Sequence, residues 1–271
     1  MSGILTVMNK KIKSVKRNYK TKNSDSDVKL AVKVGYACCA AAEISGDAVI
    51  SCGLPDGSRA LILSDGMGKG IKAAAGSRLV VSRLRRNLKE GMPVARAIKE
   101  LNRYMIDHSR ERAAGEDFAT VDLTIIDPRA ARAKFYKMGA ATSFVVRDGR
   151  VRSISQAALP VGIIPALRLT HISASLKAGD IIVMASDGIT EADREDMEAG
   201  WLAEYLSDFI EKSPANQTEQ GNNETLRHMS PRRMAAEIMQ QALQRYGGRE
   251  QDDLTVAVVV LYDEEKDFTD C

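Results

Sequence analysis

The feature that most constrains the fold is the order of short apolar segments along the chain. Strand-like segments near 28–39, 47–53 and 58–64 precede two helix-like segments, and further strand-like segments follow near 118–126, 132–138, 143–147, 150–154, 180–186 and 254–261. Turn sequences such as Pro55-Asp56-Gly57 and Asp148-Gly149 predict hairpins between neighbouring strands. Because strict alternation of strand and helix is missing, we expect antiparallel sheets flanked by helices, an α+β sandwich.

The two helix-like segments lie next to each other in the chain, at 70–89 and 93–110. The first repeats Ile71, Ala74, Ala75, Leu79 and Leu84, and the second repeats Val94, Ala97, Ile98, Leu101 and Met105. This spacing predicts two amphipathic helices, each with one apolar face. A third helix is expected over 231–245, beginning at a proline, and the polar stretch 212–230 is interpreted as a surface loop.

Length and composition are those of an ordinary globular protein. The chain has 271 residues, of which 44% are hydrophobic and 28% charged, enough for one large or two small domains. No stretch approaches the roughly 18 uninterrupted apolar residues of a membrane span, and the N-terminus lacks the apolar core of a signal peptide. We therefore expect a cytoplasmic protein with no membrane span.

The charge is unevenly distributed. Residues 1–24 contain seven Lys or Arg and no acid, which leaves 32 basic against 36 acidic residues in the rest of the chain. Such an arm could contact nucleic acid, anionic lipid or an acidic partner, or it could be a solvated tail. We divide the chain into a basic amphipathic helical arm and linker, 1–27, and a domain over 28–271.

The arm also has an apolar pattern. Leu5, Met8, Ile12, Val15 and Tyr19 are spaced by three and four residues, which places them on one stripe of a helix. The stripe covers only about two heptads, fewer than a coiled coil usually needs. It is compatible with a homodimer formed through this helix, with a partner helix, or with a single helix packed on its own domain.

The cysteines and histidines do not form a metal-binding pattern. The four cysteines lack the paired spacing of a zinc site, and His108, His171 and His228 are scattered without an H-x-x-x-H pair. A zinc hydrolase that depends on histidine ligands is therefore disfavoured.

Four aspartates recur at the edges of strongly apolar strands. Asp47 begins one strand, Asp65 and Asp187 end two others within the phrases Ser-Asp-Gly, and Asp252 directly precedes the last strand. Each alone could be an ordinary turn residue. Together, at the ends of neighbouring strands, they can converge at one rim of the sandwich, where cations would offset their mutual repulsion.

An all-oxygen ligand set favours hard ions such as Mg²⁺ or Mn²⁺. Two such ions about 4 Å apart can activate water and bind a phosphoryl group. The residues therefore suggest metal-dependent hydrolysis of a phosphate ester, with Asp47, Asp65, Asp187 and Asp252 as the candidate catalytic residues.

The sequence resembles the PPM serine/threonine phosphatases, and it is most similar to the phosphatase domain of the stage II sporulation E family. The matching motifs are Ile44-Ser-Gly-Asp47, Ser64-Asp-Gly-Met-Gly-Lys-Gly70, Ala185-Ser-Asp-Gly188 and Asp252-Asp-Leu-Thr-Val256. The resemblance covers about residues 28–262. It implies two packed antiparallel β-sheets flanked by α-helices, an α-β-β-α sandwich, with metal ions at one rim.

The resemblance also implies roles for matching positions. Asp47 and Asp65 would bind or bridge two or more Mn²⁺ or Mg²⁺ ions, and the backbone carbonyl of Gly66 would add a ligand. Asp187 and Asp252 would complete the metal site, with Asp252 rather than Asp253 as the ligand. A metal-activated water would then attack phosphorus directly.

The implied substrate is a phosphoserine on a partner protein, an anti-anti-sigma factor, so that dephosphorylation releases a sigma factor, as in sporulation. No nucleic acid partner is expected. Two alternatives remain open from the residues alone. The box around Asp65 could belong to a nucleotide-binding, ATPase-like module, or the domain could be a non-catalytic partner-switching regulator.

Overall fold

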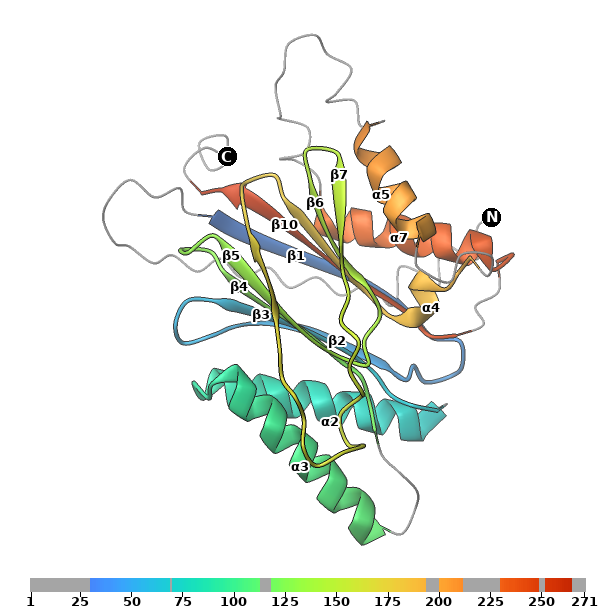
Figure 1. Ribbon diagram of the computed structural model, residues 1–271. Helices are drawn as coiled ribbons and strands as arrows, with labels where there is room; N and C mark the ends of the chain where they lie inside the picture. The colour runs from blue at the N-terminus through green and yellow to red at the C-terminus, as the bar shows by residue number, and fades with distance from the viewer. Residues whose placement is uncertain are drawn as a thin grey trace.

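The architecture is a sandwich of two five-stranded antiparallel sheets with helices on both outer faces (Figure 1). The computed structural model describes residues 30–68, 70–112, 118–193, 200–211, 230–248 and 252–264. The helical arm predicted over 1–27 and residues 212–229 of the predicted surface loop therefore lie outside the described residues.

The first sheet has the strand order β1-β10-β9-β6-β7. Its strands are β1 (Leu30–Cys39), β10 (Leu254–Asp263), β9 (Ile181–Ala185), β6 (Ser143–Arg147) and β7 (Arg150–Ile154). β10 is buried along its whole length because it is a central strand covered on both faces. Its uninterrupted apolar sequence is typical of that position.

The second sheet has the strand order β2-β3-β4-β5-β8. Its strands are β2 (Asp47–Gly53), β3 (Arg59–Asp65), β4 (Val121–Asp127), β5 (Arg132–Met138) and β8 (Ile172–Ser175). The β2–β3 hairpin turns at Gly57, whose φ of 87° favours glycine. The predicted antiparallel α+β sandwich is thus confirmed.

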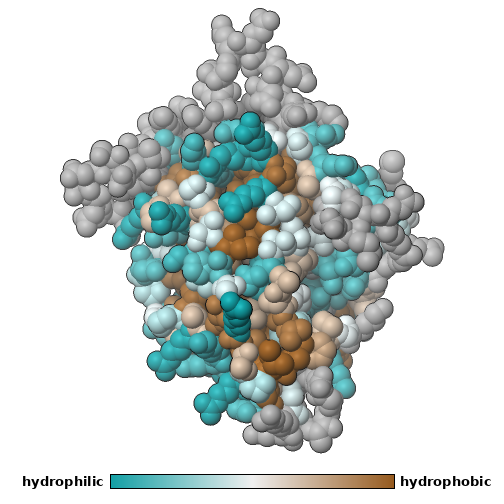
Figure 2. Space-filling view, in the orientation of Figure 1, coloured by the Kyte–Doolittle hydropathy of each residue, from teal (hydrophilic) through white to brown (hydrophobic). Residues whose placement is uncertain are grey.

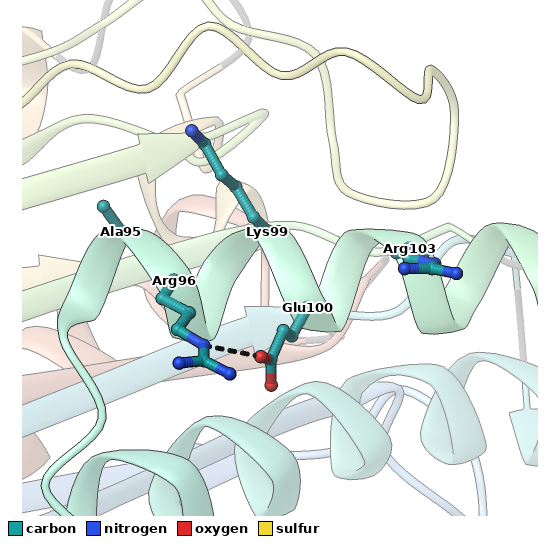
Figure 3. A pocket seen from close by; sticks show the side chains of 5 residues that line it. All are labelled: Ala95, Arg96, Lys99, Glu100 and Arg103. Atoms are coloured by element: carbon teal, nitrogen blue, oxygen red, sulfur yellow. Dashed lines mark hydrogen bonds and ion pairs between the residues drawn. The ribbon is translucent and has the colours of Figure 1, made fainter.

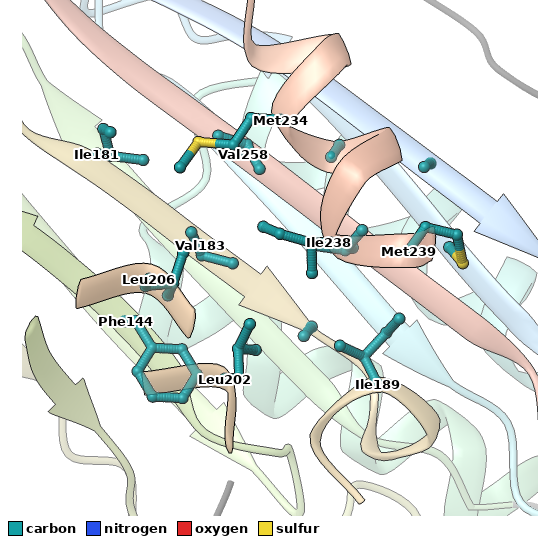
Figure 4. Packing of buried hydrophobic residues seen from close by; sticks show 14 of the residues in the cluster. Phe144, Ile181, Val183, Ile189, Leu202, Leu206, Met234, Ile238, Met239 and Val258 are labelled. Carbon is teal, nitrogen blue, oxygen red and sulfur yellow. The ribbon is translucent and has the colours of Figure 1, made fainter. Parts of the chain in front are cut away.

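Helices cover the outer face of each sheet (Figure 1). α2 (Gly70–Lys89) and α3 (Val94–Arg112) lie on the second sheet, while α4 (Asp187–Thr190), α5 (Gly200–Glu211) and α7 (Pro231–Arg245) lie on the first. Figure 4 shows Met234, Ile238 and Met239 of α7 packed over Val183 and Val258 of the sheet. α4, α5 and the short strand β8 are elements that the sequence analysis did not predict.

One detail of the predicted α2 face is wrong. Ile71 is 75% exposed and Ala75 is also exposed, whereas the face that packs on β2 and β3 consists of Ala73, Ala74, Ser77, Val80, Val81, Leu84, Asn87 and Leu88. Because residues 73, 74 and 77 are small, the helix can approach the sheet closely on the side that carries them, and that side is the buried one. Ile71 precedes this stripe and is directed into solvent.

The core between the sheets contains a buried ion pair. Lys137 of β5 donates a 2.6 Å hydrogen bond to Asp122 of β4, and both Lys137 and Asp122 contact the hydroxyl of Ser143, at the start of β6 in the other sheet. All three side chains are inaccessible to solvent. The network therefore links the two sheets through hydrogen bonds within an otherwise apolar interior.

Candidate metal centre

The β2–β3 pair places two of the predicted aspartates directly opposite each other. Asp47 begins β2 and Asp65 ends β3, and the two residues are cross-strand partners. Val49 and Leu63, two positions further in, contact the core between the sheets. Since side chains alternate along a strand, Asp47 and Asp65 face the same inter-sheet side, at its rim, with Cβ atoms about 5 Å apart.

The backbone around Asp65 is held by the start of β4. Asp65 donates its N–H to the hydroxyl of Thr120 at 2.8 Å, and Thr120 donates its own N–H to the carbonyl of Asp65 at 2.9 Å. The hydroxyl of Ser64 donates to the Thr120 carbonyl at 2.6 Å. These three bonds hold the strand end in position, so the Asp65 carboxylate projects from a fixed backbone.

Gly66 lies where α2 meets the rim. A Cβ at this position would come 1.8 Å from the carbonyl oxygen of Ala73, so only glycine permits this approach of the helix. The Gly66 N–H donates to the Gly46 carbonyl at 3.2 Å. The two loops that carry Asp47 and Asp65 are therefore joined through their glycines.

The first sheet brings Asp187 to the same rim. Ser186 and Thr255 exchange backbone and hydroxyl hydrogen bonds at 2.9 Å, which fixes the end of β9 beside the start of β10. Asp187 follows as the first residue of α4. A Cβ on Gly188 would come 2.4 Å from the carbonyl oxygen of Asp253, so the two Asp-containing segments are in direct contact.

Asp252 and Asp253 have different surroundings. The carboxylate of Asp253 accepts hydrogen bonds from the N–H groups of Ala41 at 2.8 Å and Gly46 at 2.6 Å, and so anchors the loop that leads to Asp47. Asp252 is exposed, and its carboxylate accepts a bond from the adjacent N–H of Asp253. This arrangement leaves Asp252 available as a ligand and gives Asp253 a structural role that the sequence analysis missed.

The electrostatics of the rim are those of crowded, partly buried anions. Burial, followed by the charges of Asp253 and Asp187, raises the pKa of Asp47 to about 7. Burial, followed by Asp187, Asp47, Asp252 and Asp253, raises the pKa of Asp65 to about 8. Burial and the charge of Asp252 also raise the pKa of Asp187. The two sheets thus bring all four predicted aspartates within electrostatic range of one another.

The Asp47 carboxylate has no hydrogen-bond partner. Both of its oxygens are buried without one, and the side chain is only 9% exposed. The hydroxyls of Ser186 and Thr255 lie near it and partly oppose the rise in its pKa, but neither bonds it in this geometry, and Thr255 Oγ1 is itself unpaired. A buried, unpaired carboxylate is costly unless a cation or a proton compensates it.

These donors fit a hard divalent cation. They are carboxylate oxygens, those of Asp47 have no hydrogen-bond partner, and the Gly66 carbonyl lies next to Gly46, the residue before Asp47. In the part of the chain that the structure describes, no three acidic, histidine or cysteine side chains are already close enough to form a metal-binding group.

A further acidic residue borders the centre. Glu191 directly follows α4, and burial together with the charges of Asp187 and Asp252 raises its pKa. In the sequence, Glu191 lies four residues after Asp187, about one helical turn, and this spacing could have indicated that its side chain lies near Asp187.

Two surface hollows lie away from the rim. One of about 340 Å³ lies along α3, where Figure 3 shows Arg96 paired with Glu100 beside Lys99 and Arg103. Another, of about 490 Å³, lies between the β6–β7 hairpin and β8. Neither is lined by any of the four aspartates.

Comparison with known proteins agrees with this geometry. The model of the stage II sporulation protein E (SpoIIE) family matches residues 55–261. The chain is 29% identical over 237 residues to stage II sporulation protein E of Bacillus subtilis and 30% identical over 230 residues to that of Priestia megaterium. The matched regions make up 87% and 84% of this chain, but only 26% and 36% of the lengths of the Bacillus subtilis and Priestia megaterium proteins.

Solved structures show the same architecture. The PP2C phosphatase domain of SpoIIE from Bacillus subtilis, solved with a fragment of its regulatory domain, superposes with a TM-score of 0.71 at 29% identity, covering 86% of this chain and 64% of that one. The RsbU and RsbW domains of Rv1364c from Mycobacterium tuberculosis give 0.69 at 20% identity, covering 88% and 62%, a likeness of fold. No helix within the described ranges is long and apolar enough to cross a membrane. The family match over residues 55–261 and the shared architecture show that the chain belongs to the stage II sporulation protein E family and has the fold of its PP2C phosphatase domain.

Proposed function

We propose that this domain is a metal-dependent serine/threonine phosphatase that hydrolyses phosphoserine on a partner protein. The observation that carries the proposal is the convergence of Asp47, Asp65, Asp187 and Asp252 at one rim, with the carboxylate of Asp47 buried and unpaired. Family membership and the PP2C phosphatase fold support the same reaction.

In this proposal Asp47 and Asp65 would hold two or more Mn²⁺ or Mg²⁺ ions, with the Gly66 carbonyl, Asp187 and Asp252 as further ligands. Bound divalent ions would supply the activation of water and the neutralisation of phosphate charge. The chain's own residues position these groups. Thr120 fixes the backbone at Asp65, and Asp253 fixes the loop before Asp47.

The proposed substrate is a phosphorylated anti-anti-sigma factor, whose dephosphorylation would release a sigma factor. Two observations support this substrate: the family is named for a sporulation protein, and a fold relative carries RsbU and RsbW domains. The same proposal places the domain in the cytoplasm, where such a partner would be.

Release of inorganic phosphate from a phosphorylated anti-anti-sigma protein, with Mn²⁺ or Mg²⁺ and with a chelator, tests the proposal. We expect ion-dependent release, at least ~100-fold slower after Asp187→Asn and unchanged after Asp107→Asn, an exposed aspartate on α3. A folded wild-type domain that is inactive on this protein and on p-nitrophenyl phosphate would favour the non-catalytic regulator. ATP binding by calorimetry without metal would favour the nucleotide-binding module.

A further inference from the structure

The large apolar side chains that the described chain exposes are confined to two segments. They are Met67 and Ile71, at the start of α2, and Leu159, Ile163 and Ile164, in the connection between β7 and β8; we call these five residues the apolar border. Ile71 is 75% and Leu159 49% exposed. Figure 2 shows apolar atoms gathered on this face where Figure 1 draws the β7–β8 connection.

Backbone bridges place the two segments beside each other and beside the candidate metal centre. Ala119 bridges to Gly66 on one side and to Val161 on the other, both antiparallel. Two such steps of about 4.8 Å put Val161 about 10 Å from Gly66, the proposed carbonyl ligand. Met67 also donates its N–H to the Phe118 carbonyl at 3.4 Å. The apolar border therefore begins one residue beyond the metal centre.

The β7–β8 connection is held in a defined conformation. Asn102 of α3, only 1% exposed, accepts a bond from the N–H of Gly162 at 2.8 Å and donates to the carbonyl of Ile164 at 2.9 Å. The same connection packs Val161, Leu167 and Leu169 inward against the helices. Its outward side chains, Leu159, Ile163 and Ile164, are thus presented to solvent by a fixed backbone rather than left out of a loose loop.

We propose that the apolar border is the docking surface for the folded phosphoprotein whose phosphoserine enters the metal centre. This inference rests on the proposed function. A stable protein interface covers about 800 Å² per partner, a disc of roughly 16 Å radius, so a protein bound at the centre would also cover points 10 Å away. Ions held at the acidic rim would bind the phosphate, but the rim offers the rest of a partner's surface little attraction, whereas exposed apolar side chains would supply it.

The occupant is a substrate protein rather than a second copy of this chain. A second copy bound here would lie over the metal centre and bring more acidic surface towards it. A protein that presents one phosphoserine and an apolar patch beside it complements both parts of the surface. This predicts that an intact phosphoprotein is a better substrate than a short phosphopeptide from the same protein.

The test compares the double variant Leu159→Ser/Ile163→Ser with the control Arg150→Ser/Arg152→Ser, which removes exposed side chains from the β6–β7 hairpin. Substrates are the phosphorylated anti-anti-sigma protein, a short phosphoserine peptide from it, and p-nitrophenyl phosphate. We expect kcat/KM for the protein to fall at least ~10-fold in the double variant, mainly through KM. Rates on the two small substrates, and all rates of the control, should stay within twofold.

Three results would overturn the docking surface: an unchanged kcat/KM for the protein, an equal loss on p-nitrophenyl phosphate, or a wild-type kcat/KM for the protein no higher than for its peptide. A double variant that changes the mass measured by light scattering, with turnover of the protein intact, would assign the border to self-association instead. A wild-type domain inactive on all three substrates would contradict the proposed function itself.

Discussion

At the scale of single residues, the adjacent Asp252 and Asp253 have different surroundings, which fits the proposal that only Asp252 is a metal ligand. Asp253 holds two backbone N–H groups, at Ala41 and Gly46, whereas Asp252 is exposed. We expect Asp253→Ala to lower the free energy of unfolding by about 1–3 kcal/mol, since two donors lose their acceptor. Asp252→Ala should change it by less than about 0.5 kcal/mol while weakening Mn²⁺ binding.

Urea unfolding and Mn²⁺ titration of the two variants, performed side by side, measure these effects. Equal destabilisation by both substitutions would contradict the division of roles. So would Mn²⁺ affinity that survives Asp252→Ala but is lost with Asp253→Ala in a fully folded protein.

The raised pKa values of Asp47 and Asp65 predict how stability depends on pH. A carboxyl with a raised pKa in the folded state binds more protons there than in the unfolded state, so metal-free stability falls as pH rises from near 3.8 towards about 7 and 8. The loss at pH 8 should be on the order of a few kcal/mol, lowering Tm by ~5 °C or more relative to pH 5.

Thermal unfolding of the metal-free protein at pH 5 and pH 8 measures this slope. Asp47→Asn should flatten it, because the amide does not ionise, and saturating Mn²⁺ should raise Tm most at pH 8, because the ion binds the deprotonated carboxylates. A metal-free wild-type protein that is more stable at pH 8 than at pH 5 would show that these carboxyl groups do not have raised pKa values in the folded state. The same result for the Asp47→Asn variant would show this for Asp65.

At the scale of elements, the Lys137–Asp122–Ser143 network connects β4 and β5 to β6 across the core. Lys137→Met leaves the Asp122 carboxylate buried without its cation, and Asp122 Oδ1 already lacks a hydrogen bond. We expect this variant to lose about 3–5 kcal/mol of stability in urea unfolding. The double variant Lys137→Met/Asp122→Leu should recover a large part of the loss, and a double variant that is less stable than the single one would contradict this reasoning.

The elements themselves were largely predictable where local patterns decide them. The β2–β3 and β6–β7 hairpins follow from their turn sequences, α3 follows from its apolar spacing, and α7 from its leading proline. β8 was missed because Ile172–Ser175 is short and alternates weakly, and its strand state comes from pairing with β5. α5 carried a usable signal in Trp201, Leu202, Tyr205 and Leu206, which lie on one helix face.

Packing between elements was less accessible from the sequence. Lys137 and Asp122 carry charges that usually indicate exposure, and only the strand register brings them together inside the sandwich. Ile71 fitted the helical period but lies before the part of α2 that covers the sheet. The role of Asp253 depends on loop hydrogen bonds to a segment more than 200 residues away.

At the scale of the whole molecule, the sandwich explains why aspartates so distant in the chain can act together. β2 begins and β3 ends at the rim in one sheet, β9 ends and β10 begins there in the other, and the apolar core between the sheets fixes their separation. The sequence patterns predicted this convergence, and the electrostatic coupling of the four side chains agrees with it. Their roles as metal ligands remain a prediction.

The most direct test of the central claim is to count Mn²⁺ ions bound to the metal-free domain, following the electron paramagnetic resonance signal of free Mn²⁺ during a titration. We expect the wild-type domain to bind two or more Mn²⁺ ions. Binding should be weakened or absent after Asp65→Asn and normal after Asp107→Asn. A folded wild-type domain that binds no Mn²⁺, or an Asp65→Asn variant that binds it as the wild type does, would contradict the account.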